Sequence, residues 1–257
     1  MRKFWVLILF FLPIQVFAED EEIAKIFAQY GVEGTIIIST LTSNQKFTHN
    51  DMRANKRFSP ASTFKIPNTL ISLESKAILG KDDLFKWDGT QYDFPDWNHD
   101  QTLASAFKVS CVWCYQALAK RVGTERYENY LNVLGYGELH KPFEVTMFWL
   151  NDSLKISAIE QLEFLKKLYQ RTLPFSSNAY ETLKEIMQVE KMPSFTLFAK
   201  TGWTARLNPQ IGWYVGYVET TREVWLFALN LDIRNAKDLI LREKITKDIL
   251  KQKGIIE

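Results

Sequence analysis

Cysteine, histidine, glycine and proline are all scarce in this chain of 257 residues, which has two Cys, three His, 11 Gly and eight Pro. Two cysteines are too few for a disulfide framework, so a large apolar core has to supply the stability. The histidines, His49, His99 and His140, match no zinc-binding spacing, so no metal site is expected. Glycine and proline are not concentrated in any segment, which excludes collagen-like and linker-rich chains.

An excess of charge of one sign is also lacking. Lys and Arg total 32 against 30 Asp and Glu, a formal net charge of +2. Because a nearly balanced charge does not predict a basic surface that binds a polyanion, nucleic acid is not an expected partner. No P-loop or G-x-S-x-G motif occurs. Gly135-Tyr136-Gly137 lacks the third glycine of a nucleotide-binding pattern and fits a turn after a helix ending near Leu134 better.

Residues 1–18 are interpreted as a secretory signal peptide. A positively charged start precedes the apolar run Phe4 to Leu12, and Val16-Phe17-Ala18 precedes an acidic cluster. This order is typical of a signal peptide, and the apolar run is too short for a membrane span. We expect cleavage after Ala18 and a mature chain, residues 19–257, that forms one domain. The expected location is the bacterial periplasm, without membrane attachment after cleavage.

Segments with strand character lie at both ends of the mature chain. Residues 33–40 and 45–50 are separated by turn chemistry, which predicts a hairpin. Three aromatic and β-branched runs near the C-terminus predict further strands: 194–203, 210–219 and 223–231. Residues 237–252 then show helical spacing of apolar residues.

The middle of the chain is mostly helical by the spacing of its apolar residues. The predicted helices cover residues 66–79, 103–122, 125–134, 157–169 and 179–188. Ser157 followed by Glu160 predicts a capping box. Strands from both termini bury their apolar faces when they share a sheet. We therefore expect an α/β fold of the α+β type. Its antiparallel sheet is built from N- and C-terminal strands and flanked by helices, with an inserted, mostly helical lobe and a cleft beside it.

Cys111 and Cys114 have the C-x-x-C spacing of redox motifs, but they fall inside the predicted helix 103–122. Because a regular helical turn disfavours disulfide geometry, we expect two buried or half-buried free thiols rather than a redox pair.

Ser62-Thr63-Phe64-Lys65 is the sharpest chemical signal. Residues three apart on a helix point the same way, and a serine hydroxyl needs a nearby base to become a nucleophile. Ser59 as N-cap and Pro60 as first helical residue would place the Ser62 N–H where it can stabilise an oxyanion. Pro67 predicts an irregular helix. Taken alone, S-x-x-K recurs by chance, and an exposed helical pair is the alternative interpretation.

Two further motifs follow, Ser110-Cys111-Val112 in a helical context and Lys200-Thr201-Gly202 on a strand. In acyl transfer, cationic and hydroxyl groups hold the substrate's carboxylate, and a glycine lets the substrate lie against the backbone. Arg242 could add a bidentate clamp, the alternative being a solvated surface charge. Likewise, the alternative for Ser110 is a hydroxyl that only forms a hydrogen bond with the backbone of its own helix.

In this order, the three motifs resemble those of the penicillin-interacting serine enzymes, and within them the class D, oxacillinase-type β-lactamases. The resemblance runs from about Phe58 to Ile256. It includes four further segments: Phe148-Trp149-Leu150, Ile156-Ser157-Ala158, Ile211 to Val218, and Leu241-Arg242-Glu243. Val112 resembles class D, because class A enzymes have a polar Asn there. Glu128 to Asn132 mimics a class A deacylation motif, but it comes too soon after Ser110 and is read as coincidence.

The resemblance implies a site of two groups of residues. The catalytic group is Ser62, Lys65, Ser110, Val112, Trp149 and Trp203, and the substrate-binding group is Lys200, Thr201, Gly202, Arg242, Leu150 and Arg206. It implies that Lys65 is N-carboxylated by carbon dioxide or bicarbonate, with no other cofactor, and that the Trp149 indole N–H holds the carboxylate. Carboxylated Lys65 is then the general base of acylation and deacylation, and Ser110 relays a proton to the leaving nitrogen.

Small-molecule β-lactams are the implied substrates, namely penicillins and oxacillin, and the implied role is β-lactam resistance. Arg206 resembles a basic residue of some carbapenem-hydrolysing relatives, which adds carbapenems to the substrates to be compared. One departure is Tyr136-Gly137-Glu138, where the family usually has Tyr-Gly-Asn. This change affects the geometry of that loop and the efficiency, not the role of Ser62. The alternatives are a β-lactam sensor domain and a cell-wall transpeptidase or carboxypeptidase.

Overall fold

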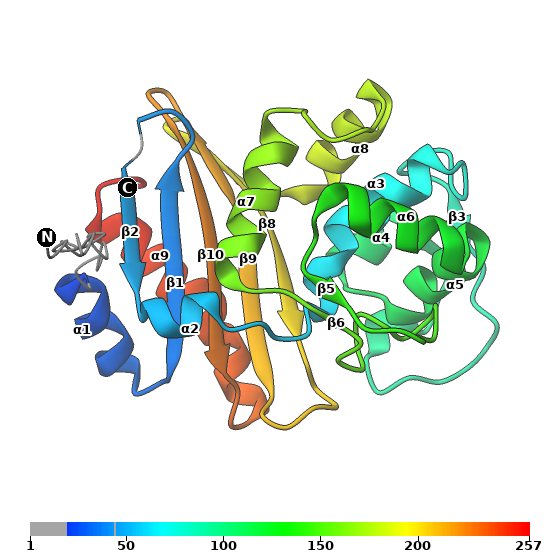
Figure 1. The fold of residues 1–257 in the computed structure, drawn as a ribbon, viewed down its shortest axis with the longest axis horizontal. Helices are drawn as coiled ribbons and strands as arrows, with labels where there is room; N and C mark the ends of the chain where they lie inside the picture. Colours follow the sequence, from blue (N-terminus) through cyan, green and yellow to red (C-terminus); the bar gives the residue numbers. More distant parts are fainter. Residues whose placement is uncertain (1–19, 44) are drawn as a thin grey trace, which may run out of the picture.

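The computed structural model describes residues 20–43 and 45–257, so the predicted signal peptide and its cleavage site lie outside the described residues. A sheet with helices on both faces forms one half of the molecule, and a mostly helical lobe forms the other (Figure 1). Among the described residues, no helix is both long and apolar enough to cross a bilayer.

The main sheet contains strands from both ends of the chain, as predicted. Its order is β2-β1-β10-β9-β8-β7, and every neighbouring pair is antiparallel. The strands are β1 (Gly34–Thr40), β2 (Lys46–His49), β7 (Gln188–Lys191), β8 (Phe195–Trp203), β9 (Ile211–Thr220) and β10 (Val224–Asp232). The predicted hairpin is β1 with β2, and β1 pairs with β10, from Gly34 opposite Leu231 to Thr40 opposite Trp225.

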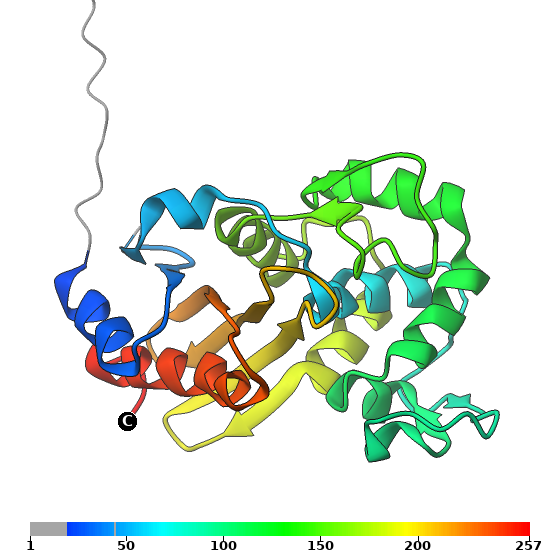
Figure 2. The ribbon, with the colours of Figure 1, turned by 90° about the horizontal axis from the view of Figure 1, so that it is seen from below.

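Helices cover both faces of this sheet (Figure 2). On one face lie α1 (Glu21–Tyr30), which the sequence analysis missed, and α9 (Leu241–Gln252), preceded by the 3₁₀ helix η3 (Ala236–Ile240). They enclose an apolar cluster with the sheet. On the other face lies α7 (Ala158–Tyr169), whose predicted capping box between Ser157 and Glu160 is present. Its apolar side joins the larger core, which continues into the lobe.

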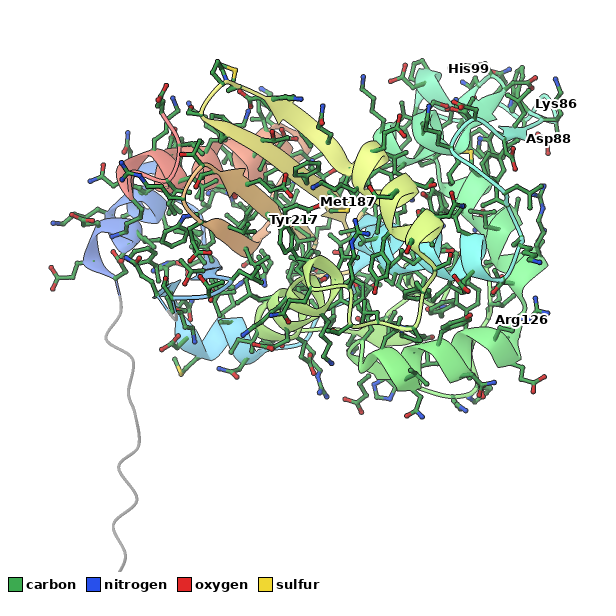
Figure 3. All side chains as sticks on the ribbon, turned by 90° about the horizontal axis from the view of Figure 1, so that it is seen from above. Lys86, Asp88, His99, Arg126, Met187 and Tyr217 are labelled. Atoms are coloured by element: carbon green, nitrogen blue, oxygen red, sulfur yellow. A yellow bond between two sulfur atoms is a disulfide. The ribbon has the colours of Figure 1, made fainter. Side chains whose placement is uncertain are left out.

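The lobe packs several helices around α3 (Lys65–Glu74), of which every residue except Glu74 is buried. The other helices of the lobe are η1 (Ala61–Phe64), η2 (Pro95–Trp97), α4 (Leu103–Lys108), α5 (Val112–Val122), α6 (Thr124–Leu134) and α8 (Ser177–Met187), whereas α2 (Asp51–Asn55) lies against β1 and α7 in the sheet half (Figure 1). Two short hairpins complete it, β3 (Leu84–Phe85) with β4 (Gln101–Thr102) and β5 (Glu138–Leu139) with β6 (Leu154–Lys155). Figure 3 places Lys86, Asp88 and His99 at the tip of the lobe, and Met187 and Tyr217 where α8 meets the sheet.

The single helix predicted over residues 103–122 is wrong, because the chain breaks it between α4 and α5. Ser110 adopts a left-handed backbone conformation with φ of +58°. Its N–H donates to Phe107 O (3.3 Å), and the next N–H, of Cys111, donates to Ala106 O (2.9 Å). These two bonds form the Schellman motif that ends a helix. Because Ser rather than Gly occupies the left-handed position, the apolar spacing concealed the break.

The prediction of free thiols is also wrong, because Cys111 and Cys114 form a disulfide with a Cα–Cα distance of 5.5 Å. Cys111 is the N-cap of α5, with φ of −53° and ψ of 111°, and not an interior helical residue. Since the objection to a disulfide rested on two cysteines within one regular turn, the helix break removes it.

The predicted helix 66–79 also begins differently. Ser59 is not its N-cap: the Ser59 hydroxyl donates to Trp149 O (2.9 Å), the same carbonyl that accepts the Ala61 N–H (3.0 Å). Pro60 caps η1, which passes directly into α3 at Lys65. The irregularity expected from Pro67 is this change of helix type. Pro67 is the third residue of α3, close to the helix start, where proline is tolerated better than in a helix interior.

Strand β9 approaches β8 closely at Gly216, which is opposite Ala199. A Cβ atom on Gly216 would lie 2.1 Å from Phe198 O, a backbone atom that cannot move without shifting β8. We predict that Gly216→Ala lowers the free energy of unfolding by about 3 kcal/mol, the upper range for overpacking a core. Gly80→Ala is the control, since nothing lies within 4 Å of its Cβ position. Equal denaturation midpoints for the two variants would contradict this packing.

Candidate active site

Ser62 and Lys65 come together where η1 meets α3. Ser62 is the second residue of η1, where an amide N–H has no acceptor within the helix. Lys65 is the first residue of α3, and its Nζ lies 3.3 Å from Ser62 Oγ. The predicted pairing of hydroxyl and amine is therefore present. Lys65 is buried and Ser62 is half-buried, which contradicts the alternative of an exposed helical pair.

Lys65 is enclosed by apolar groups, with only 1% of its surface exposed. Its Nζ lies 4.7 Å from the centre of the Tyr115 ring, and no carboxylate in the described chain pairs with it. Burial, with a smaller contribution from the charge of Lys200, lowers the pKa of Lys65 well below its ordinary value. Burial therefore favours the neutral form of the amine more than it would be favoured in an exposed lysine. This form can accept a proton or react as a nucleophile.

Trp149 presents a buried hydrogen-bond donor. The residue is fully buried, and its ring stacks on Phe64 with 5.6 Å between ring centres. In the described structure its indole Nε1 has no hydrogen-bond partner. Buried donors are rarely left unsatisfied in proteins, so this N–H is available to an acceptor that the amino-acid side chains do not supply.

The second and third motifs meet through one short hydrogen bond. Lys200 Nζ donates to Ser110 Oγ at 2.5 Å and lies 3.4 Å from Thr201 Oγ1. Ser110 thus contacts Lys200, so its predicted alternative role, serving only the helix backbone, is wrong. Burial, followed by the charge of Arg242, lowers the pKa of Lys200 to about 7, while Glu243 opposes this shift.

The position of Gly202 leaves no room for a side chain, because η1 packs directly against it. A Cβ at this position would lie 2.9 Å from Pro60 O and 3.1 Å from Thr63 Cγ2, so its absence lets β8 pack against η1. The next residue, Trp203, lies opposite Gly212 in the β8–β9 register. Because the Thr204 N–H donates to Ile211 O, and amides along a strand alternate in direction, the Trp203 N–H points away from β9.

Arg242 reaches the end of β8 from α9. Its Nη1 donates to Gly202 O and its Nε to Leu239 O, both at 2.7 Å. Burial lowers the pKa of Arg242 to about 10. The interpretation as a solvated surface charge is therefore wrong. A guanidinium has five N–H donors, so three remain to bind an anion.

A cleft of about 260 Å³ joins these elements. The predicted residues that line it are Ser62, Ser110, Val112, Leu150, Thr201, Gly202, Trp203, Arg206 and Arg242. Lys65, Lys200 and Trp149 are buried and do not line this cleft. Sequence reasoning missed other residues that line the cleft, and the largest apolar side chains among them are Phe94, Trp97 and Leu239. No motif marks them, because they lie in or beside 3₁₀ turns without helical or strand periodicity.

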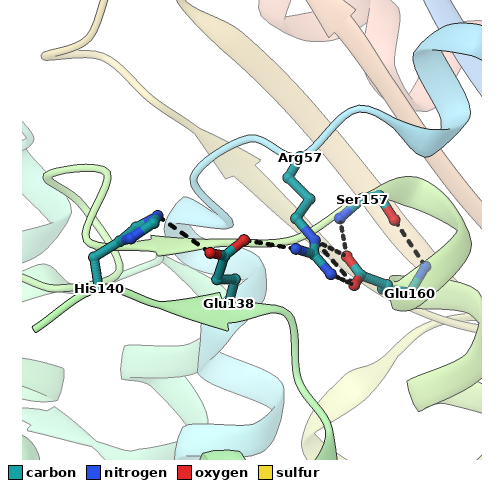
Figure 4. Close-up of polar contacts among 5 residues, drawn as sticks. All are labelled: Arg57, Glu138, His140, Ser157 and Glu160. Atoms are coloured by element: carbon teal, nitrogen blue, oxygen red, sulfur yellow. Dashed lines mark hydrogen bonds and ion pairs between the residues drawn. The ribbon is translucent and has the colours of Figure 1, made fainter.

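Glu138, the departure from the family pattern, is tied to the segment that leads to Ser62 (Figure 4). Arg57 donates to Glu138 at 2.6 Å and to Glu160 at 2.5 Å, while His140 Nε2 lies 4.0 Å from Glu138. The residue after Arg57, Phe58, forms a bridge with Ile156 before the chain enters η1. The loop therefore has an ionic anchor at this position.

Comparison with known proteins identifies the family. The model of the penicillin binding protein transpeptidase domain matches residues 35–251. The chain is 40% identical to β-lactamase OXA-48 of Klebsiella pneumoniae over 90% of this chain and 87% of that protein. It is also 40% identical to β-lactamase OXA-20 of Pseudomonas aeruginosa, over 90% of this chain and 87% of that protein.

Solved structures agree. The class D β-lactamase FUS-1 (OXA-85) of Fusobacterium nucleatum superposes with a TM-score of 0.90 at 39% identity, covering 93% of this chain and all of that one. The predicted fold class is confirmed by these neighbours and by the antiparallel sheet with its flanking helices. The chain therefore belongs to the class D serine β-lactamases, within the penicillin-binding transpeptidase family.

Proposed function

We propose that this protein hydrolyses penicillin-type β-lactams through an acyl-enzyme on Ser62, with N-carboxylated Lys65 as general base in both half-reactions. The observation that carries the proposal is the fully enclosed Lys65 amine, 3.3 Å from Ser62 Oγ and without a carboxylate partner in the described chain. Its lowered pKa supplies the neutral amine that carboxylation requires.

Carboxylation fits the surroundings of Lys65. The amine nitrogen attacks the carbon of carbon dioxide, forms one N–C bond and releases one proton, which leaves an anionic carbamate. An anion in an apolar enclosure needs a hydrogen-bond donor, and the unsatisfied indole N–H of Trp149 is one. The carbamate supplies the negative charge and basicity that a protonated lysine lacks.

Acylation begins when Lys65 takes the proton of Ser62 and Oγ attacks the β-lactam carbonyl carbon. The N–H groups of Ser62 and Trp203 stabilise the resulting oxyanion. As the C–N bond of the ring breaks, Ser110 passes a proton from Lys200 to the nitrogen, along the 2.5 Å bond between them. Lys65 then activates a water molecule, which cleaves the ester and frees Ser62.

The substrate is recognised through its carboxylate. Thr201 and the free N–H groups of Arg242 border the cleft, with Lys200 beside them. Two cations and a hydroxyl around one partly enclosed position favour a single small anion. Leu150, Val112 and the aromatic rings of Phe94 and Trp97 present apolar surface to the remainder of the substrate. Penicillins and oxacillin combine these features, and Arg206 on the cleft makes carbapenems a substrate to compare.

The wider role proposed is β-lactam resistance from the periplasm. Export by a leader cleaved after Ala18 would place the enzyme between the outer membrane and the cell-wall enzymes that β-lactams attack. Neither nucleic acid nor a membrane is part of this role.

Replacing the proposed base tests the mechanism. We predict that Lys65→Ala lowers kcat by about 10³-fold or more, as expected when a general base is removed. The measurement is intact mass during turnover of oxacillin with bicarbonate present. The wild type shows an adduct that forms and disappears over many turnovers, and Ser62→Ala shows none. Unimpaired turnover by Lys65→Ala would refute the assignment, and a persistent wild-type adduct would favour the sensor or transpeptidase alternative.

Trp149→Phe tests the donor to the carbamate. With ¹³C-bicarbonate, the wild type is expected to show one protein-bound carbamate resonance by NMR. The variant loses the indole N–H and is expected to lose that signal together with most of its activity. Trp225→Phe is the matched control, because Trp225 stacks on Phe47 in the sheet, outside the cleft. A full-strength resonance in Trp149→Phe would show that this donor is dispensable.

The pH dependence of kcat/KM tests whether the charge of Arg242 lowers the pKa of Lys200. Protonated Lys200 is the form that donates to Ser110, so kcat/KM should fall as pH rises through about 7. The charge of Arg242 lowers the pKa of Lys200, so Arg242→Gln should move this fall to higher pH while raising KM. Bicarbonate is kept saturating, and Arg222→Gln, on an exposed turn, serves as control. An unmoved profile in Arg242→Gln would contradict this effect of Arg242.

A further inference from the structure

The Cys111–Cys114 disulfide lies directly beside Ser110, yet the proposed reaction makes no use of it. Both residues are fully buried. The bond links the N-cap of α5 to the third residue of that helix, so it closes only one short turn. Because such a small loop restricts the unfolded chain little, its contribution to stability through chain entropy is modest. The position of the disulfide beside Ser110 indicates a role other than stabilising the fold.

Ser110 is held in a conformation that residues other than glycine rarely adopt. Its φ is +58°, in the left-handed region. The two hydrogen bonds of the Schellman motif tie Ser110 to α4, because its own N–H donates to Phe107 O and the next N–H, of Cys111, donates to Ala106 O. In this conformation the Ser110 hydroxyl accepts a hydrogen bond from Lys200 Nζ at 2.5 Å. Relaxation of φ would turn the hydroxyl away from that amine.

The following side of Ser110 is tied to α5 through the cysteines. Cys111 Sγ accepts the Cys114 N–H at 3.2 Å, and the disulfide adds a covalent link across the same turn. This turn is itself fixed in the lobe, because the Trp113 indole donates to Trp97 O (3.0 Å) and the Tyr115 hydroxyl pairs with Thr69 (2.8 Å). Ser110 therefore bridges two anchored helices, and the disulfide fixes the residue on its α5 side.

We propose that the Cys111–Cys114 disulfide is a positioning device that holds Ser110 in its left-handed conformation against Lys200. This inference rests on the proposed role of Ser110 in passing a proton during acylation. The bond forms when a disulfide-bearing oxidant takes two electrons and two protons from the thiols and is itself reduced to thiols. Since both cysteines are buried, this occurs before folding is complete, and the folded protein resists reductants. The oxidised chain is the fully active one.

The test separates acylation from deacylation in the Cys111→Ala/Cys114→Ala and Cys111→Ser/Cys114→Ser double variants. With a chromogenic cephalosporin, stopped flow gives the acylation and deacylation constants, and the burst amplitude gives the number of working sites. We expect acylation to slow about tenfold, in line with the cost of a small misplacement, while deacylation and the burst amplitude change by less than about twofold. The control is Ile249→Val, in the apolar cluster beneath α9.

The redox state is measured by alkylation with iodoacetamide and intact mass. The native wild type is expected to remain unlabelled and to gain two labels only after denaturation and reduction. Two labels after denaturation without reduction would overturn the proposal, because the cysteines would then be free thiols. So would acylation constants equal to the wild type in both double variants, because the bond would then be only structural.

Should neither double variant fold, wild-type chain refolded with the two cysteines reduced is compared with the reoxidised chain. A tenfold difference in acylation supports the proposal, and equal constants overturn it. Failure of the proposed function itself gives a different result, since the wild type would then form no acyl-enzyme on Ser62.

Discussion

The chemistry of this site depends on the removal of two lysine amines from water. Lys65 and Lys200 are both nearly fully buried, and burial is the main cause that lowers the pKa of each. The charge of Lys200 adds to the shift of Lys65, and the charge of Arg242 adds to the shift of Lys200. In water both amines would be protonated at neutral pH, and neither could exchange a proton readily with a serine. Enclosure favours the neutral form of Lys65, which the proposed carboxylation requires, and sets the pKa of Lys200 near 7, where this amine can give and regain a proton.

The junction between sheet and lobe produces this enclosure. Gly202 lets β8 lie against η1, so that the strand carrying Lys200 and the helix carrying Ser62 are neighbours. The Trp149 carbonyl accepts both the Ser59 hydroxyl and the Ala61 N–H, which holds the lobe's loop against η1 from the opposite side. The residues that surround the amines are therefore the same ones that join the two halves of the molecule. Stability of this junction and function of the site rest on common contacts.

Sequence patterns predicted the sheet and the main helices from two different signals. Runs of β-branched and aromatic residues marked the strands, most of which are buried on both faces, and apolar residues three and four apart marked the helices. These signals gave β1, β2, β8, β9, β10 and α7 within a few residues of their observed bounds. The motifs likewise predicted the cluster of Ser62, Lys65, Ser110 and Lys200. Their spacing alone could not place them together, and that step came from the resemblance. The fold had to be seen before the alternatives for Ser110 and Arg242 could be decided.

The misses share a physical cause, which is backbone conformation that composition does not encode. Ser110 occupies a position where glycine is usual, so the end of α4 was invisible, and with it the disulfide at Cys111. Ser59 has the right side chain for an N-cap, but a tertiary acceptor, Trp149 O, captures its hydroxyl. Phe94, Trp97 and Leu239 form part of the cleft from irregular turns. Glu138 departs from the family pattern, and its partner Arg57 lies 81 residues earlier in the chain.

The dependence of kcat on carbon dioxide tests the central claim most directly. The enzyme is freed of bound carbon dioxide by brief exposure to mild acid under degassed conditions, returned to neutral pH, and assayed with increasing bicarbonate. Neutral, enclosed Lys65 predicts low activity at first and a saturable recovery to the full rate, with no change in protein mass other than that of one carboxyl group. Full activity without bicarbonate would contradict the account, because the uncarboxylated amine would then suffice as base.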